Sequence, residues 1–213
     1  MKNIVVGLLC VALLAGCGAH RMSPVAPQTI GDLKPEVEDK DSGLVGVRPD
    51  FALKTYSALI LMPFKLPPVE LKDDEGAQLA KDMIVYLQAR LLKNLRAAGI
   101  FAKVVDGAAA DAALGDEKAL RLEGDMTELT EGNRALRYLV GFGAGAAKAQ
   151  IETRLVDVQT RRVELVTADR RAAAMGVFGG EGRQFLTESM DQMAEGYVKL
   201  LKHISGGGKP GAR

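Results

Sequence analysis

The stretch KAQIETRLVDVQTRRVELVTADRRAA, residues 148–173, alternates polar and apolar side chains and is rich in β-branched residues. Such alternation is typical of a strand that buries one face. The pattern is interrupted near residues 159–161, where polar side chains follow one another. The stretch therefore predicts two strands joined by a short turn. We expect Asp157 to organise that turn rather than to transfer a proton.

Three further segments have strand character. The apolar run YSALILMPF, residues 56–64, has the length of a buried strand and is bounded by prolines. The run IFAKVV, residues 100–105, predicts another strand. The segment ALRLEGDMTEL, residues 119–129, alternates strictly enough to predict one buried and one wet face.

Two other segments have the period of an amphipathic helix. The first begins at Asp73 or Asp74, which can cap it, and stops at Gly99; the second runs from about Arg183 to Ile204. The apolar positions are Leu79, Met83, Ile84, Leu87, Leu91 and Leu95 in the first, and Leu186, Met190, Met193, Tyr197, Leu200 and Ile204 in the second.

These elements predict a single α+β domain over residues 51–204. We expect two layers: a mixed, mostly antiparallel sheet of about five strands, with both amphipathic helices on one face. The second helix has a four-three spacing that could also pair with a partner helix, but packing on its own sheet is the expected role. Gly196, in the middle of that helix, indicates that something approaches the helix closely.

The first residues, MKNIVVGLLCVALLAGCGAH, have the pattern of a secretory signal peptide over residues 1–16. The motif Leu14-Ala15-Gly16-Cys17 resembles the lipobox of bacterial lipoproteins, in which the cysteine is lipidated. The alternative is an ordinary secretory peptide, which would leave Cys17 as an unpaired thiol. Lipidation of Cys17 is the preferred interpretation, and it makes the membrane the first expected partner.

The residue after the lipobox bears on location. In bacterial lipoproteins, an Asp at this position favours the inner membrane, and here the residue is Gly18. This resemblance implies a lipid-anchored protein on the periplasmic face of the outer membrane.

Residues 17–50 contain four of the eight prolines and no sustained period, which predicts a flexible tether after the lipidated cysteine. As flexible coil, the tether would hold the domain on the order of 30 Å from the membrane. The alternative, that part of this range packs on the domain, applies best to Leu44–Val47. At the other end, residues 205–213, SGGGKPGAR, predict a disordered tail.

A glycine-rich stretch raises the question of nucleotide binding, because Gly141, Gly143 and Ala146 have the spacing G-x-G-x-x-A. That motif needs a helix after its glycines to hold the phosphate. Here the following residues have the pattern of a strand. We therefore expect no nucleotide and interpret Gly141, Gly143 and Gly145 as a structural turn where strands bend or approach another backbone.

The same stretch carries a family resemblance. The segment NRALRYLVGFGAG, residues 133–145, followed by a strand and then LVDVQT, is similar to an uncharacterised family of bacterial lipoproteins, the domain of unknown function numbered forty-four ten. In that family the Asp-x-x-Thr is usually followed by Gly, where this chain has Arg161. If the turn needs a left-handed backbone at this position, a residue other than glycine is strained there by roughly 1 kcal/mol or more. The resemblance implies a fold and a location but no activity.

Charge and composition argue against several function classes. Without residues 1–16 the chain has 27 basic residues, since Lys2 is lost from 28, against 27 acidic ones. This balance predicts no nucleic-acid partner. The two histidines, His20 and His203, lie far apart, and no nucleophile and base have a recognisable spacing. We expect no metal, no cofactor and no enzymatic activity.

One loop is a candidate for binding. The glycine-rich segment MGVFGGEG, residues 175–182, carries Val177 and Phe178, and apolar residues on a loop often serve recognition. The equally weighted alternative is that Phe178 packs beneath the last helix. The sequence as a whole predicts a non-enzymatic binding or accessory module of the cell envelope, with another envelope protein as partner. The alternative is a small-molecule or lipid carrier, or a cryptic hydrolase, with a pocket beside Gly141–Gly145.

Overall fold

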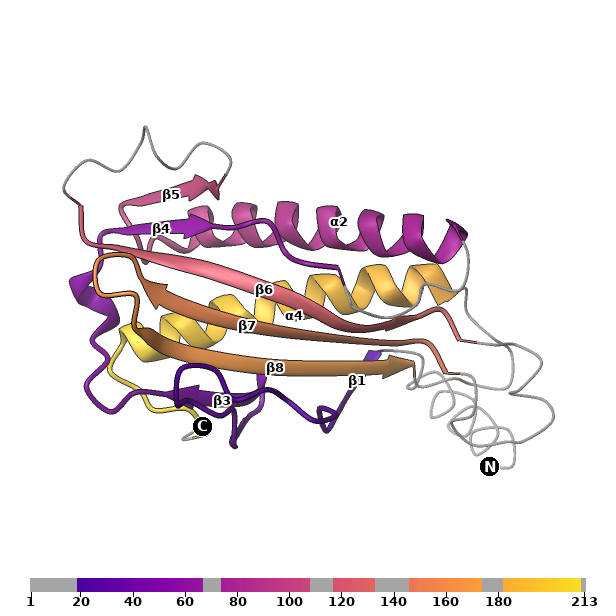
Figure 1. Ribbon diagram of the computed structural model, residues 1–213, viewed down its shortest axis with the longest axis horizontal. Coiled ribbons are helices and arrows are strands. Elements are labelled where there is room, and N and C mark those ends of the chain that lie inside the picture. Colours follow the sequence, from indigo (N-terminus) through magenta and orange to yellow (C-terminus); the bar gives the residue numbers. More distant parts are fainter. Residues whose placement is uncertain (1–18, 67–73, 108–116, 133–145, 174–181, 212–213) are drawn as a thin grey trace, which may run out of the picture.

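The computed structural model describes residues 19–66, 74–107, 117–132, 146–173 and 182–211. In this part of the chain, two long helices lie along a curved sheet (Figure 1). The strands are β1 (Ala19–Met22), β2 (Val37–Asp39), β3 (Gly43–Val47), β4 (Ala58–Leu61), β5 (Lys103–Asp106), β6 (Ala119–Thr130), β7 (Lys148–Asp157) and β8 (Val163–Ala173). The helices are the short 3-10 helix η1 (Leu53–Thr55) and the α-helices α2 (Asp74–Ala98) and α4 (Gly182–Ser205).

The sheet has the order β2-β3-β8-β7-β6-β4-β5, and β1 pairs with the part of β8 that β3 leaves free. Strand β4 runs parallel to both of its neighbours, β5 and β6, and all other pairs are antiparallel. The predicted α+β class and the mixed, mostly antiparallel sheet are confirmed. The expected number of about five strands is wrong, because the described residues form eight.

The three additional strands come from the range that we expected to be a tether. Strand β1 pairs with the end of β8, and β3 pairs with its beginning. The four prolines of this range lie between the strands, in connections that pack on the sheet. The Gln150 side chain, for example, both accepts from and donates to the backbone of Val25, at 2.8 and 3.0 Å. The tether prediction is therefore wrong for residues 19–50, and the alternative for Leu44–Val47 is correct.

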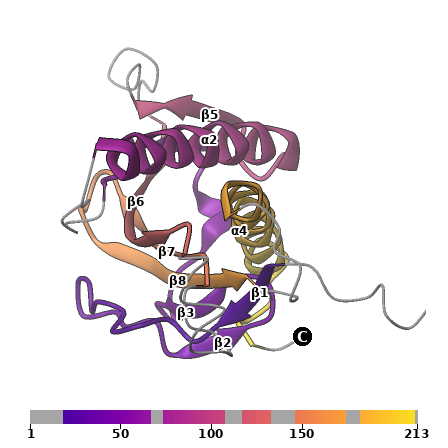
Figure 2. The same cartoon turned by 90° about the vertical axis from the view of Figure 1, so that its right-hand side faces the viewer.

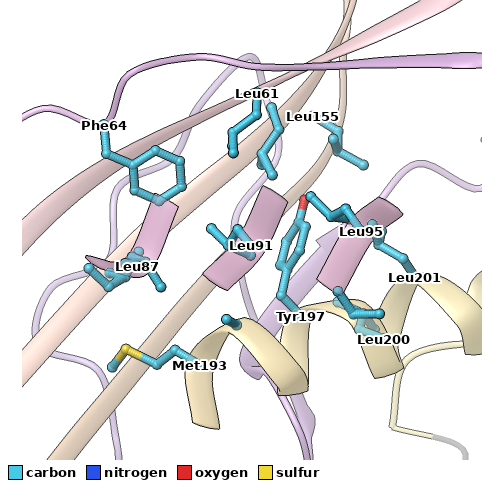
Figure 3. Close-up of a cluster of buried hydrophobic side chains, with 14 of the residues drawn as sticks. Leu61, Phe64, Leu87, Leu91, Leu95, Leu155, Met193, Tyr197, Leu200 and Leu201 are labelled. Atoms are coloured by element: carbon cyan, nitrogen blue, oxygen red, sulfur yellow. The ribbon is translucent and has the colours of Figure 1, made fainter. Parts of the chain in front are cut away.

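Each helix buries the apolar stripe that its period predicts. Leu87, Leu91 and Leu95 of α2 face Met193 and Tyr197 of α4, and side chains of the sheet close the core (Figure 3). The apolar positions of α4 are thus used inside the domain. Figure 2 shows strands β6, β7 and β8 curving around the side on which α2 and α4 lie. The finer expectation of two layers stays a prediction.

Polar side chains also join the two helices. The Tyr86 hydroxyl of α2 donates to the Asp191 carboxylate of α4 at 3.0 Å, and Arg90 forms an ion pair with the same carboxylate at 2.5 Å. Closer to the helix starts, Arg183 of α4 pairs with Asp82 of α2 at 2.6 Å. These pairs advance together along both helices, so α2 and α4 run parallel and begin at the same end of the molecule.

The central strand β6 has the two faces that its alternation predicts. Leu120, Leu122 and Met126 are fully buried beneath the helices. On the opposite face, Glu123 and Asp125 accept from the guanidinium of Arg154 on β7 at 2.6 and 3.0 Å. The outer face of the sheet is therefore held by charge-assisted hydrogen bonds, which are stronger than neutral ones.

The end of the chain is more ordered than its composition indicates. The nitrogen of Gly208 donates to the carbonyl of His203 at 2.9 Å, and the His203 ring bonds the carbonyl of Lys209 at 2.9 Å. Gly211 packs against Val37 of β2. The predicted disordered tail is thus wrong for residues 205–211. None of the helices in the described ranges combines the length and the apolarity that a membrane span needs.

Candidate functional site

The residues singled out by sequence lie mostly outside the described part of the chain. Cys17, the predicted lipidation site, Gly141, Gly143 and Gly145, and the loop residues Val177 and Phe178 all fall there. Their described neighbours in sequence nevertheless locate the places where these segments leave and re-enter the fold.

These places meet at one end of the molecule. Ala19, two residues after Cys17, pairs with Ala173 at the end of β8. The adjacent Ala172 pairs with Lys148 at the start of β7, which in turn pairs with Thr130 at the end of β6. Residues 133–145 therefore connect the end of β6 to the start of β7, and β7 is the direct neighbour of β8, the strand that β1 joins.

The start of α4 completes the same end. Gly182 packs closely against the backbone of Glu131, which directly follows β6. Residues 174–181 thus connect the end of β8 to a helix start beside the end of β6. We call this region the anchor end and define it by Ala19, Thr130, Lys148, Ala173 and Gly182. It lies on the right-hand side of Figure 1.

Strand β1 is held at the anchor end by a buried charge cluster. Arg21 of β1 donates to the carbonyl of Asp39 at 2.9 Å and forms an ion pair with Asp169 of β8 at 3.4 Å. The guanidinium of Arg171 donates a hydrogen bond to the other oxygen of the same carboxylate at 2.8 Å. Only 9% of each side chain of Asp169 and Arg171 is exposed, so removing one partner would leave a buried charge uncompensated.

The cluster continues to α4 and to the turn between β2 and β3. Arg171 also donates to the Gln192 side chain of α4 at 2.7 Å. The nitrogen that donates to Asp169 at 2.8 Å, Nη2, also lies 3.4 Å from the carbonyl oxygen of Asp41 in the turn. We call Arg21, Asp169, Arg171 and Gln192 the β1 clamp, because an ion pair joins β1 to β8 and hydrogen bonds join β8 to α4. Sequence reasoning missed it, since its members come from three distant segments.

The turn between β2 and β3 sits directly on α4. The Ser42 hydroxyl donates to the carbonyl of Gly196 at 2.9 Å, and the Asp39 carboxylate orders the turn by accepting from the nitrogens of Asp41 and Ser42. A Cβ at Gly196 would collide with the carbonyl oxygen of Asp41. The close approach predicted from Gly196 is confirmed, and the approaching group is the chain's own turn.

A small cavity lies next to this turn, between the helices and the sheet. Its volume is about 20 Å³, and its polar lining includes Thr153, Thr167, Asp169 and Tyr197. The Thr153 and Thr167 hydroxyls bond each other at 2.6 Å, whereas the buried Tyr197 hydroxyl has no hydrogen-bond partner among the residues that the structure describes. Burial raises the pKa of Tyr197. The volume suffices for one water molecule and is far below that of a ligand pocket.

The opposite end of the sheet is closed by the turn between β7 and β8. One oxygen of Asp157 accepts from the nitrogens of Gln159 and Thr160, each at 2.8 Å, and the other accepts from the Tyr56 hydroxyl at 2.7 Å. Asp157 therefore organises the turn, as predicted. Burial disfavours its charge, but the bonds from Thr160 and Tyr56 outweigh burial and lower the pKa of Asp157.

This turn also contains the strain that the family resemblance implies. Arg161 has a φ of 60°, in the left-handed region. We call the region of Tyr56, Asp157, Gln159 and Arg161 the turn end. It lies one length of β8 from the anchor end, and at about 3.3 Å per residue the strand spans roughly 33 Å.

Metal ligands do not gather at either end within the described ranges. No group of three or more His, Cys, Asp or Glu side chains is placed there to hold an ion. Of the two histidines, His20 lies exposed on β1, and the ring of His203, near the end of α4, is hydrogen-bonded to the carbonyl of Lys209.

Several solved structures resemble the chain distantly. A variant PelC dodecamer from Paraburkholderia phytofirmans is 18% identical, with a TM-score of 0.47, over 75% of this chain and 98% of that chain. A DUF330 protein from Xanthomonas campestris is 14% identical, with a TM-score of 0.44, over 76% and 94%. A minor lipoprotein from Acinetobacter baumannii is 17% identical, with a TM-score of 0.34, over 71% and 94%. No curated protein matches the chain.

A family match covers most of the described fold. Residues 34–193 match the family described as a domain of unknown function, DUF4410. The matched range begins shortly before β2 and ends at the middle of α4, and it includes residues 133–145, on which the resemblance was first based. The chain therefore belongs to the DUF4410 family.

Proposed function

We propose that the protein is a lipoprotein of the bacterial cell envelope, anchored through lipid on Cys17 to the periplasmic face of the outer membrane. In this proposal its domain works as a non-enzymatic binding or accessory module for another envelope protein. The lipobox Leu14–Cys17 supports the anchor, and Gly18 supports the outer membrane. No cofactor, nucleotide or nucleic acid is part of the proposal.

The position of β1 is the observation that carries the proposal. Ala19 is already a sheet residue, so only Gly18 separates it from Cys17. Two residues of extended chain reach at most about 7 Å. A domain held this closely cannot carry a ligand across the periplasm. The short link favours an accessory module that works at the membrane surface over a shuttling carrier.

The cavity beside Tyr197 does not supply the pocket of a carrier. A carrier needs a pocket that buries most of its ligand, typically several hundred Å³. The cavity beside Tyr197 has a volume of about 20 Å³. It therefore fits a bound water better than a lipid or a small-molecule substrate.

The anchor is tested by labelling cells with a fatty acid that carries an alkyne and by separating the membrane fractions. We expect the wild-type protein to be labelled and to sediment with the outer membrane. Cys17→Ser should lose both properties, whereas Cys10→Ser, in the predicted signal peptide, should keep them. A labelled or membrane-bound Cys17→Ser protein would contradict the anchor. Gly18→Asp should move the protein towards the inner membrane.

The binding role is tested by in-cell cross-linking of a C-terminally tagged protein, followed by mass spectrometry of the membrane fraction. We expect a reproducible envelope partner that Phe178→Ala loses without loss of folding. The matched control is Val85→Ala on α2, which removes an apolar side chain that is 66% exposed and far from the predicted loop in sequence. If no partner exceeds the unanchored Cys17→Ser background, the binding module is refuted and the carrier or hydrolase becomes the better hypothesis.

A further inference from the structure

We infer that the anchor end lies directly against the phospholipid headgroups, so that the strands and helices stand away from the membrane and the turn end projects into the periplasm. This inference rests on the proposed lipid anchor at Cys17. It adds an orientation and a contact surface that the anchor alone does not imply. A lipoprotein on a long tether would have neither.

The short link sets the distance. Cys17 would carry its acyl chains in the bilayer, which places its backbone at the level of the headgroups. Ala19 follows at most about 7 Å away. Ala19 pairs with Ala173, and Lys148 and Thr130 follow in the next two strands. The neighbouring ends of three long strands are thereby brought close to the headgroup layer.

The β1 clamp makes the link stiff. Strand β1 is paired with β8 at all four of its residues, and Arg21 is tied to both Asp39 and Asp169. Because Asp169 and Arg171 are buried, β1 cannot leave the sheet without exposing their charges. The domain therefore cannot swing on β1.

The described side chains of the anchor end fit a headgroup layer. His20, Thr130, Glu131 and Arg183 are exposed there, and all four are polar or charged. Such groups stay hydrated among phosphates and amines, whereas burying them in hydrocarbon would be costly. These four side chains are thus suited to resting on the bilayer rather than to entering it.

The opposite end is then held away from the membrane. Strand β8 runs from the anchor end to the turn end over roughly 33 Å, and α4, with 24 residues at about 1.5 Å each, spans a similar length. Gln159 and Arg161 at the turn end are exposed. The structure therefore assigns these two ends opposite surroundings, one lipid and one aqueous.

The orientation can be measured with a single fluorophore. The only two cysteines are Cys10, in the predicted signal peptide, and Cys17, whose thiol the lipid would occupy. An introduced cysteine is then the one reactive thiol of the anchored protein. We would label His20→Cys and Thr130→Cys at the anchor end and Gln159→Cys at the turn end. Each full-length lipidated protein would be placed in vesicles of phosphatidylethanolamine and phosphatidylglycerol that contain a headgroup nitroxide.

We expect the nitroxide to quench the labels at positions 20 and 130 strongly and to leave the label at position 159 unchanged. Equal quenching at positions 130 and 159, or stronger quenching at 159, would overturn the orientation while leaving the lipid anchor intact. A protein with Cys17 that does not sediment with the vesicles would overturn the proposed function, and the orientation with it.

A linker variant supplies the matched control. A flexible Gly-Ser segment inserted between Gly18 and Ala19 keeps the anchor and the folded domain but removes the short link. We expect this variant to sediment with the vesicles as before and to lose the quenching at Thr130→Cys. Unchanged quenching would show that the short link does not set the orientation, which would overturn the inference.

Discussion

At the scale of single residues, Arg161 shows how the chain departs from its family. Its φ of 60° is a conformation that glycine adopts freely and that costs other residues roughly 1 kcal/mol. We predict that Arg161→Gly raises the free energy of unfolding by about 1 kcal/mol, measured by urea denaturation. The control is Gln159→Gly in the same turn, which has no such strain to relieve and should be neutral or destabilising. An equal gain in both variants would contradict the explanation.

Asp157 links the same turn to pH. Its folded pKa is lowered, chiefly by hydrogen bonds that outweigh the effect of burial, so the folded state favours the charged carboxylate. The stabilisation is complete above the unfolded pKa of about 4 and is lost as the pH falls through the folded value.

We therefore predict that Asp157→Asn destabilises the protein at neutral pH and progressively less as the pH falls below the unfolded pKa of about 4, because the wild-type protein then loses the stabilisation from its charged carboxylate. Urea denaturation across this range gives the difference between the two proteins. The pKa of Glu123 is lowered as well, because the bonds from Arg154 outweigh its burial. Comparing the variant with the wild type cancels that contribution. A difference that is constant with pH would contradict the role of the charge.

At the scale of elements, the contact between the β2–β3 turn and Gly196 of α4 helps to hold the N-terminal strands on the domain. Replacing Gly196 by Ala would favour the helix by about 1 kcal/mol if nothing lay beside it. Here the added Cβ meets the carbonyl of Asp41. We predict a net loss of about 2 kcal/mol in thermal or urea unfolding, because overpacking forces backbone to shift. Glu195→Ala, on the exposed side of the same turn of helix, should change little.

The elements also differ in how far the sequence predicts them. The residues of β6, β7 and β8 alternate over ten or more positions, and both helices keep their period over more than twenty, so local pattern is enough. Strands β1, β2 and β3 have only three to five residues each and stand among prolines. What makes β1 and β3 strands is the free edge of β8, more than 100 residues later, together with the buried pairing of Arg21, and β2 then pairs with β3. No local pattern contains that information.

The candidate site was predictable to a similar degree. Gly196 and Asp157 were interpreted correctly because each has a specific backbone role that its residue type indicates. The β1 clamp could not be predicted. Arg21, Asp169 and Arg171 have the sequence pattern of a solvent-exposed strand face, and only the fold places them beneath α4. The described neighbours of Cys17, of residues 133–145 and of residues 174–181 meet at the anchor end because of the order of the strands in the sheet. Strand order cannot be predicted from the local pattern of a single sequence.

At the scale of the whole molecule, residues 19–50 are part of the folding unit. Without β1 and β3, one edge of β8 would lose all of its partners and become an open edge, which favours aggregation. We predict that a chain starting at residue 51 is unfolded or aggregated, whereas one starting at residue 19 is folded and cooperative in thermal denaturation followed by circular dichroism. If the chain starting at residue 51 is a stable monomer in size-exclusion chromatography, residues 19–50 are not needed for folding and the tether prediction is supported instead.

The pairing of β1 with β8 also orders events in time. In the proposed exported lipoprotein, Ala19 would be among the first residues of the domain to cross the inner membrane, and its partner Ala173 among the last. Closing so long a loop carries an entropic cost that slows folding. Through most of export the chain has no complete sheet, and strands that need β8 wait unpaired beside the bilayer. Attachment of lipid at Cys17 would then precede folding, and the membrane surface itself becomes the place where this domain is assembled.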